Sequence, residues 1–181
     1  MSYDKVTSDQ YWSKDCHISG KNLYLIIDMI HYENTRQGMN AYFQNRTAFF
    51  KETISLFKGT IDEDLKEVAP YLCSANFSDE AITTEDRAFL ETEEQNIPSL
   101  IWLSSDLNIN ELHTHLQHFL SAKLKNGREA LLRFYDPRVV PTFLNMLKAE
   151  QAEAFWKEID QIALWGREEK QRIIYRREKH A

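Results

Sequence analysis

The stretch LYLIIDMI, residues 23–30, is a nearly continuous apolar run closed by Asp28. Because successive side chains of a strand point to opposite sides of a sheet, such a run predicts a strand that is buried on both faces. A second apolar run, SLIWLSS at residues 99–105, follows Pro98 and predicts another core strand. These two segments place a β-sheet at the centre of the fold.

Shorter strands and turns are predicted on either side of these runs. YLCSAN, residues 71–76, follows Pro70, which stops any preceding helix. FFKETISLF, residues 49–57, fits either a strand or a helix. Asn126 and Gly127 predict a hairpin turn, since Asn-Gly supplies the positive φ angles that a tight turn needs. The strands of this hairpin are expected at 121–124 and 129–135, and those of a second hairpin at 163–167 and 171–177.

Helix-start signals and helical spacing of apolar residues mark the segments between the strands. The clearest case begins at Asn108, where Glu111 three residues later completes a capping-box pattern. Leu112, Leu116 and Leu120 then fall on one apolar stripe. Helices are predicted at 34–46, 83–94, 108–120, 139–147 and 149–161.

The order of strands and helices predicts an α/β (α+β) fold in which helices pack on a mixed β-sheet. A chain of 181 residues with 43% hydrophobic composition suits one domain, or one domain with a small lobe. We predict an N-terminal extension at 1–21, an α/β lobe at 22–136, and a small C-terminal helical lobe with a closing hairpin at 137–181.

Charge is unevenly spread along this chain, whose net charge is −6. Residues 62–94 contain eleven acids and two bases, whereas residues 167–180 contain six bases and three acids. The acidic middle argues against nucleic-acid binding, which needs a dominant basic face. The acidic segment is expected to be a solvated face, with a partner-docking surface as the alternative. The basic tail is expected to be a solvated hairpin, or a docking element for an acidic partner.

The sequence also indicates the compartment. Its polar N-terminus has no apolar core of a signal peptide, and no run approaches about 20 apolar residues, so we expect no membrane partner. Cys16 and Cys73 lie far apart and form no CxxC motif. Reduced thiols in a cytoplasmic protein are therefore the expected state.

Sites for chemistry are not indicated by any motif. His113, His115 and His118 suggest a metal site, but at about 100° per residue the three side chains cannot converge on one ion. The sequence has no GxGxxG, no P-loop and no G-x-S-x-G elbow. We therefore predict no catalytic, cofactor-binding or metal-binding residues, and no cofactor.

The stretch LLRFYDPRVV, residues 131–140, places two arginines and an aspartate around one proline. In a strand over 129–135, Arg133 would lie beside the core, where an unpaired charge is very unfavourable. Asp136 is the expected partner or cap. The pattern favours a structural corner, and a direct ligand site that uses Arg133, Asp136 and Arg138 is the alternative.

The same stretch predicts how the chain continues. An aspartate before a proline accepts hydrogen bonds from the amides of the following turn, and Pro137 fixes that turn. We expect a turn through 136–138 and a helix that starts near Val139 or Val140. Pro141 would then lie in the first turn, where proline is tolerated.

Four segments together resemble the adaptor-chaperone family of bacterial type VI secretion, often called Tap or Tec proteins and first catalogued as a domain of unknown function. They are LYLIID, APYLC, HLQHFL and NGREALLRFYDPRVV, which occur in that order over about residues 22–147. The last segment is long and specific, and the others are weak alone. The matching positions are Asp28, Pro70, Tyr71, Leu72, His115, Leu116, Arg133, Phe134, Tyr135, Asp136, Pro137 and Arg138.

This resemblance implies a cytoplasmic protein that is not an enzyme. It implies an adaptor that binds a cognate toxic effector and helps load it onto a VgrG-type spike protein. Aromatic side chains often anchor such contacts, and those outside the family-like segments are the candidate partner-binding residues: Tyr11, Trp12, Trp156, Trp165 and Tyr175. The alternatives are a small-anion binder or enzyme that uses the Arg133, Asp136 and Arg138 cluster, or a general protein-interaction module.

Overall fold

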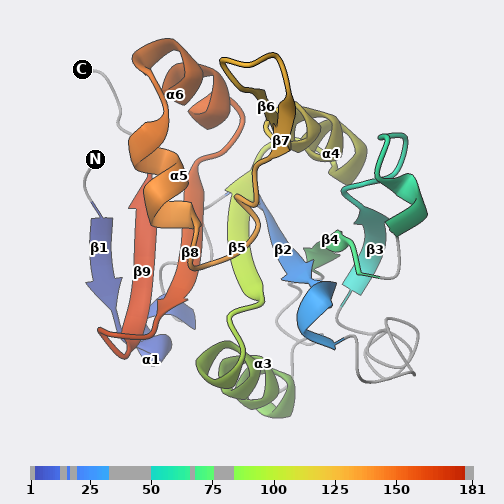
Figure 1. The fold of residues 1–181 in the computed structure, drawn as a ribbon. Coiled ribbons are helices and arrows are strands. Elements are labelled where there is room, and N and C mark those ends of the chain that lie inside the picture. Colours follow the sequence, from blue (N-terminus) through green and yellow to red (C-terminus); the bar gives the residue numbers. More distant parts are fainter. Residues whose placement is uncertain are drawn as a thin grey trace.

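A seven-stranded β-sheet runs through the middle of the molecule (Figure 1). The computed structural model describes residues 3–12, 16, 20–32, 50–65, 68–75 and 84–177, and the helix predicted at 34–46 lies outside them. Neighbouring strands of this sheet are antiparallel, in the order β1-β9-β8-β5-β2-β4-β3. The strands are β1 (Tyr3–Val6), β2 (Asn22–Asp28), β3 (Phe50–Ser55), β4 (Pro70–Ala75), β5 (Leu100–Ser105), β8 (Gln161–Gly166) and β9 (Gln171–Arg176).

Strands β2 and β5 form the centre of the sheet, as the two apolar runs predicted. Leu25 lies opposite Trp102, and Ile27 lies opposite Leu100. Every residue of β5 is buried. Both strands carry apolar side chains on both faces, so an internal position in a covered sheet suits them. The segment 49–57, for which strand and helix were both open, contains β3 at one edge.

Two separate apolar cores cover the two faces of the sheet. The first face, which includes Ile26 and Ile101, packs against α4 (Ile109–Gln117), α5 (Val140–Met146) and α6 (Ala149–Trp156). The second face, which includes Leu25 and Trp102, packs against α3 (Thr84–Asn96) and against Tyr11 and Trp12, which follow α1 (Ser8–Gln10). Figure 1 shows α5 lying over β8 and β9. The predicted α+β class is confirmed.

Strands from all three predicted segments enter this one sheet. β9 pairs with β1, and β8 pairs with β5. The sheet therefore crosses both predicted boundaries, at residues 21 and 136, and the closing hairpin is not a separate lobe. Burial explains this arrangement: Ile162 and Leu164 lie in the first core, whereas Ala163 and Ile174 lie in the second. A hairpin with apolar side chains on both faces needs cover on both.

The helices begin close to the residues at which start signals predicted them, but α4 and α6 end earlier than predicted. Asn108 Oδ1 accepts from the amide of Glu111 at 3.0 Å, and Glu111 Oε2 accepts from the amide of Asn108 at 3.0 Å, which confirms the capping box. α4 ends at Gln117 rather than at 120. α6 ends at Trp156 rather than at 161, because Gln161 already pairs with Ser104 in the sheet.

The hairpin predicted around Asn126 and Gly127 forms a separate two-stranded sheet, β6 (Ser121–Lys123) and β7 (Glu129–Leu131). Gly127 has a φ of 79°, and its amide donates to Leu124 O at 2.9 Å. Within the described chain Asn126 does not share the positive φ. The connection is therefore longer than the two-residue turn that Asn-Gly predicted.

None of the helices in the described ranges is long and apolar enough to cross a bilayer.

Two histidines attach α4 to segments on either side of it. His113 Nε2 lies 2.9 Å from Ser55 O on β3, and His115 Nε2 lies 3.0 Å from Phe155 O on α6. Because a carbonyl only accepts, each ring donates through Nε2. The two rings therefore bind different segments and do not share a ligand. Burial lowers the pKa of both His113 and His115.

We expect acid to weaken the fold through these two rings. A histidine whose folded pKa is lowered binds protons more tightly when unfolded, so its contribution to stability is present above the unfolded pKa, about 6.5, and is lost as the pH falls through the folded pKa. The melting temperature should fall by a few degrees between pH 7.5 and 5.0. The variant with both His113→Gln and His115→Gln should show a flatter profile over this range, and an unchanged slope would contradict the assignment.

Candidate functional site

Four charged residues form a cluster, the charged corner, where β2 ends and α5 begins: Asp28, Arg133, Asp136 and Arg138. Arg133 Nη2 donates to Asp28 Oδ2 at 2.8 Å and lies 3.6 Å from Asp136 Oδ2. Arg138 binds both oxygens of Asp136, through Nε at 2.9 Å and Nη2 at 2.7 Å. The two carboxylates are buried, whereas the side chains of Arg133 and Arg138 are 36% and 53% exposed. Two arginines at the surface thus neutralise two buried acids.

The partner of Arg133 differs in part from the prediction, in which Asp136 is its partner or a cap. Asp136 caps the turn and lies 3.6 Å from Arg133. The closer partner of Arg133 is Asp28, at the end of β2 and 105 positions away in the chain. Asp136 is held instead by Arg138, in a two-pronged contact whose planar geometry suits a carboxylate. The corner therefore joins the first and the last of the family-like segments.

The strand predicted at 129–135 ends early, because β7 stops at Leu131. Phe134 and Tyr135 are both buried in the first core. Adjacent residues of a strand point to opposite faces, so a continuing strand could not bury both on one side. The chain turns instead, and the amide of Asp136 donates to Arg133 O at 3.0 Å.

The turn after Asp136 follows the local signals. Asp136 Oδ1 accepts from the amide of Arg138 at 3.0 Å, as expected of an aspartate before Pro137. α5 then starts at Val140, and Pro141 lies in its first turn, as predicted. The corner is thus built by local turn chemistry and closed by one long-range contact.

The pKa of Asp28 is raised and that of Asp136 is lowered, because burial outweighs ion pairing at the first carboxylate but not at the second. Burial raises the pKa of Asp28, although the Arg133 guanidinium opposes this. Burial also acts to raise the pKa of Asp136, but the hydrogen bonds from Arg138 outweigh it and the pKa is lowered. Burial raises the pKa of Tyr135 to about 12, so its hydroxyl stays neutral. Its ring centroid lies 5.8 Å from the Arg133 guanidinium carbon.

Three of the described side chains could in principle hold a cation at this corner. Asp28, His31 and Asp136 each offer a ligand atom, and these atoms lie within 4.8 Å of one another. Sequence reasoning did not include His31, whose only signal is its place three residues after Asp28. Arg133 already supplies a fixed positive charge to both carboxylates. The arrangement is therefore better suited to holding the arginine than to binding a metal ion.

The other family-like residues lie around the corner or support the core. Pro70 begins β4 and lies opposite Asp28 in the sheet. Tyr71, the next residue, lies opposite Ile27. His115 is apart from the corner, on α4, where it binds α6. These positions shape the scaffold around the corner.

Four of the five aromatic anchor candidates are buried inside this chain. Tyr11 and Trp12 lie in the second core, and Trp156 and Tyr175 in the first. The core of this chain covers Tyr11, Trp12 and Trp156. Tyr175 is also nearly buried, but it lines a groove at the surface together with Trp165, which is half-buried.

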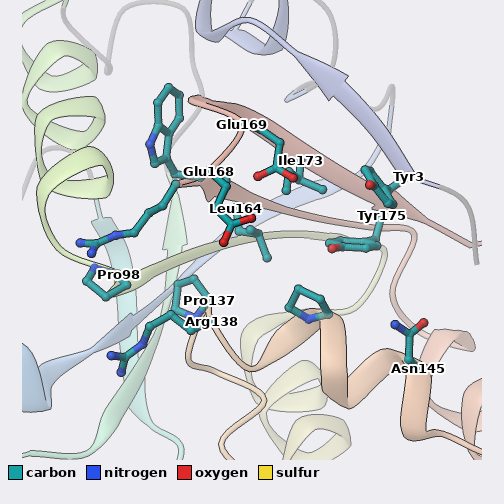
Figure 2. A pocket seen from close by; sticks show the side chains of 14 residues that line it. Tyr3, Pro98, Pro137, Arg138, Asn145, Leu164, Glu168, Glu169, Ile173 and Tyr175 are labelled. Carbon is teal, nitrogen blue, oxygen red and sulfur yellow. The ribbon is translucent and has the colours of Figure 1, made fainter.

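This groove, the α5 groove, has a volume of about 500 Å³ and opens beside the charged corner on the first face of the sheet (Figure 2). Pro137 and Asn145 lie on its α5 side, and Tyr3 and Glu168 lie across from them, as Figure 2 shows. Sequence reasoning missed it, because it joins β1, the β8–β9 hairpin and α5. Its other lining residues are Pro98, Arg138, Pro141, Leu164, Trp165, Gly166, Arg167, Glu169, Ile173 and Tyr175.

The fold and the site define an α+β protein built on a seven-stranded antiparallel sheet, with internally paired charges at its corner. A family model described as "Domain of unknown function (DUF4123)" matches residues 23–154, more than half of the chain, and the protein belongs to this family. The match includes β5, all of β2 except Asn22, and the charged corner. No curated protein and no solved structure matches the chain.

Proposed function

We propose that this protein is a type VI secretion adaptor that binds a cognate toxic effector in the cytoplasm and helps load it onto a VgrG-type spike protein. Family membership over residues 23–154 carries this proposal, together with the segment NGREALLRFYDPRVV inside that range. The segment resembles the signature of the Tap or Tec adaptors. The secretion role is our inference from that resemblance.

The proposed role involves binding without chemistry. The charged corner supports it, because Arg133 donates to Asp28 and Arg138 to both oxygens of Asp136. A small anion would have to compete with these two buried carboxylates for the guanidinium groups. Separating such pairs leaves buried charges without partners, which is strongly unfavourable. The corner thus suits a scaffold that keeps its shape while other surfaces contact partners.

Affinity purification from the bacterial host tests the proposal. The tagged protein should recover one toxic effector and a VgrG-type spike protein, each enriched at least about tenfold over a strain that expresses the tag alone. Interfaces of standard size, about 800 Å² per partner, commonly survive such purification. Deleting the gene should abolish export of that effector and leave export of other effectors unchanged. Recovery of neither partner, with normal export in the deletion strain, would refute the proposal.

A further inference from the structure

We propose that the α5 groove binds an extended, largely apolar segment of the exported effector that carries a lysine or arginine opposite Glu168. This inference rests on the proposed adaptor function and adds to it the binding surface and the chemistry of the bound segment. Three observations carry it: the apolar lining of the groove, the exposed sheet edge beside it, and the balance of charges at its rim.

The lining of the groove combines buried apolar side chains with an accessible opening. Leu164, Ile173 and Tyr175 are nearly buried, with exposures of 2%, 6% and 5%, whereas Tyr3 is 48% exposed. The rings of Tyr3 and Tyr175 lie 5.7 Å apart. A volume of about 500 Å³ falls within the range of ligand-binding clefts, which is roughly 300–1,000 Å³. Aromatic rings and prolines around such a cleft favour apolar and proline side chains over charged ones.

A sheet edge lies beside this opening. β1 pairs with β9 on one side only, and within the described residues no strand pairs with its other side. An edge strand turns backbone donors and acceptors outward, and an extended segment can pair with them. Tyr3 and Lys5 lie opposite Tyr175 and Ile173, so alternate side chains of β1 stand on the groove side of the sheet. A segment paired with β1 would therefore turn alternate side chains to the side of the sheet on which the groove lies, next to Tyr3.

Among the charged side chains at the rim of the α5 groove, one acid has no ion-pair partner in the described part of the chain. Arg138 is engaged by Asp136, and Lys5 Nζ lies 3.5 Å from Glu169. Arg167 Nη2 donates to Asn96 O, the last residue of α3, where a positive charge suits the helix C-terminus. Glu168 is exposed and has no ion pair among the described residues. The complementary ligand group is a lysine or arginine, and this selects a basic segment over an acidic one.

The position of the groove relative to the family match favours cargo over spike as the occupant. Pro137 and Asn145 belong to the matched range 23–154, whereas Tyr3 and Glu168 lie outside it. The groove thus combines the shared scaffold with segments beyond it. Such a composite surface suits a partner that differs between adaptors.

Site-specific photo-crosslinking in the host tests this inference on the full chain. The probe is p-benzoylphenylalanine introduced in place of Asn145, which is exposed and lines the groove. The matched control carries the same residue in place of Thr142, which is exposed on the same helix but does not line the groove. The expected adduct forms at 145 and not at 142. Mass spectrometry should place it on an extended effector segment with a lysine or arginine within a few residues.

A charge reversal tests the assigned ligand chemistry. Glu168→Lys should reduce the adduct at 145 by about tenfold, because a like charge would face the bound base. Glu150→Lys, at an exposed position of α6 outside the groove, should leave the yield unchanged. Both variants should keep the wild-type melting temperature, which separates lost binding from lost folding.

The remaining outcomes overturn the inference in distinguishable ways. If purification recovers the effector but no adduct forms at 145, the groove assignment fails and the adaptor function stands. If neither appears, both fail. An adduct with a second copy of this chain, with the spike protein, or with an effector segment that has no nearby base gives the groove a different occupant. An adduct that Glu168→Lys does not weaken removes the charge complementarity.

Discussion

Arg172→Met is expected to lower the free energy of unfolding by about 3–5 kcal/mol. Arg172 and Glu94 form an ion pair in the second core, where their side chains are 0% and 1% exposed. Their two contacts are Nη1 to Oε1 at 3.0 Å and Nη2 to Oε2 at 2.5 Å. Removing the guanidinium leaves the Glu94 carboxylate buried, with the indole N–H of Trp102 still donating to it. Urea unfolding at pH 7 measures the loss.

Two control variants distinguish the effect of breaking the buried ion pair from the effect of losing packing contacts. In the variant with both Glu94→Met and Arg172→Met, most of the stability should return, because no buried charge is left unpaired. Arg176→Met removes the partner of Asp4 at the surface, and we expect a change below about 1 kcal/mol. Equal losses in Arg172→Met and Arg176→Met would show that burial of the pair is unimportant.

Arg172 also holds the N-terminal segment. Its guanidinium carbon lies 4.2 Å from the ring centroid of Tyr11 and 5.6 Å from that of Trp12. Trp12 in turn donates from Nε1 to Glu91 Oε1 on α3 at 2.6 Å. Arg172→Met should therefore loosen residues 3–12 first, and hydrogen exchange should be fastest there in the variant.

Arg133→Met is expected to lower the free energy of unfolding by about 2–4 kcal/mol. The loss arises at Asp28, which is 1% exposed and loses its guanidinium partner. We expect less than for Arg172, because Arg133 is 36% exposed and water can partly replace it. Arg138→Met should lower it by less than about 1 kcal/mol, since Arg138 is 53% exposed and Asp136 keeps a backbone amide and Arg133.

The pH dependence of Arg133→Met identifies Asp28 as the cause. Burial raises the pKa of Asp28, and in the variant this effect is no longer opposed by the Arg133 guanidinium. A carboxyl whose folded pKa lies above its unfolded value binds protons more tightly when folded. The deficit relative to wild type should therefore be largest at pH 7 and shrink as the pH falls through the folded pKa. A deficit that is constant from pH 7 to 4 would assign the loss to packing.

Local signals predicted the elements that local interactions decide. The apolar run at 23–30 and the capping box at Asn108 each depend only on a few neighbouring residues. The strand and the helix start that they predict are both confirmed. Pro141 likewise restricts where α5 can begin. These signals require no knowledge of distant segments.

Long-range contacts decided the features that sequence reasoning missed. Asp28 meets Arg133 across 105 positions, and Glu94 meets Arg172 across 78. No local pattern distinguishes a lysine or arginine in a solvated hairpin from one that enters the core. Tyr11 is an aromatic residue of the kind that anchors interfaces, yet it is fully buried. The side chain that covers its ring, Arg172, comes from the other end of the chain.

The pairing of β1 with β9 determines when during synthesis the central sheet and the α5 groove are completed. Asp4 and Arg176, 172 positions apart, meet across these two strands. β1 is made before the other six strands of this sheet, whereas its partner β9 is made after them, and β5 also waits for β8. Contacts between such distant segments form late in folding. A chain in which β9 is not yet made lacks Ile173 and Tyr175, which line the α5 groove, so the groove is complete only after β9 has paired with β1 and β8.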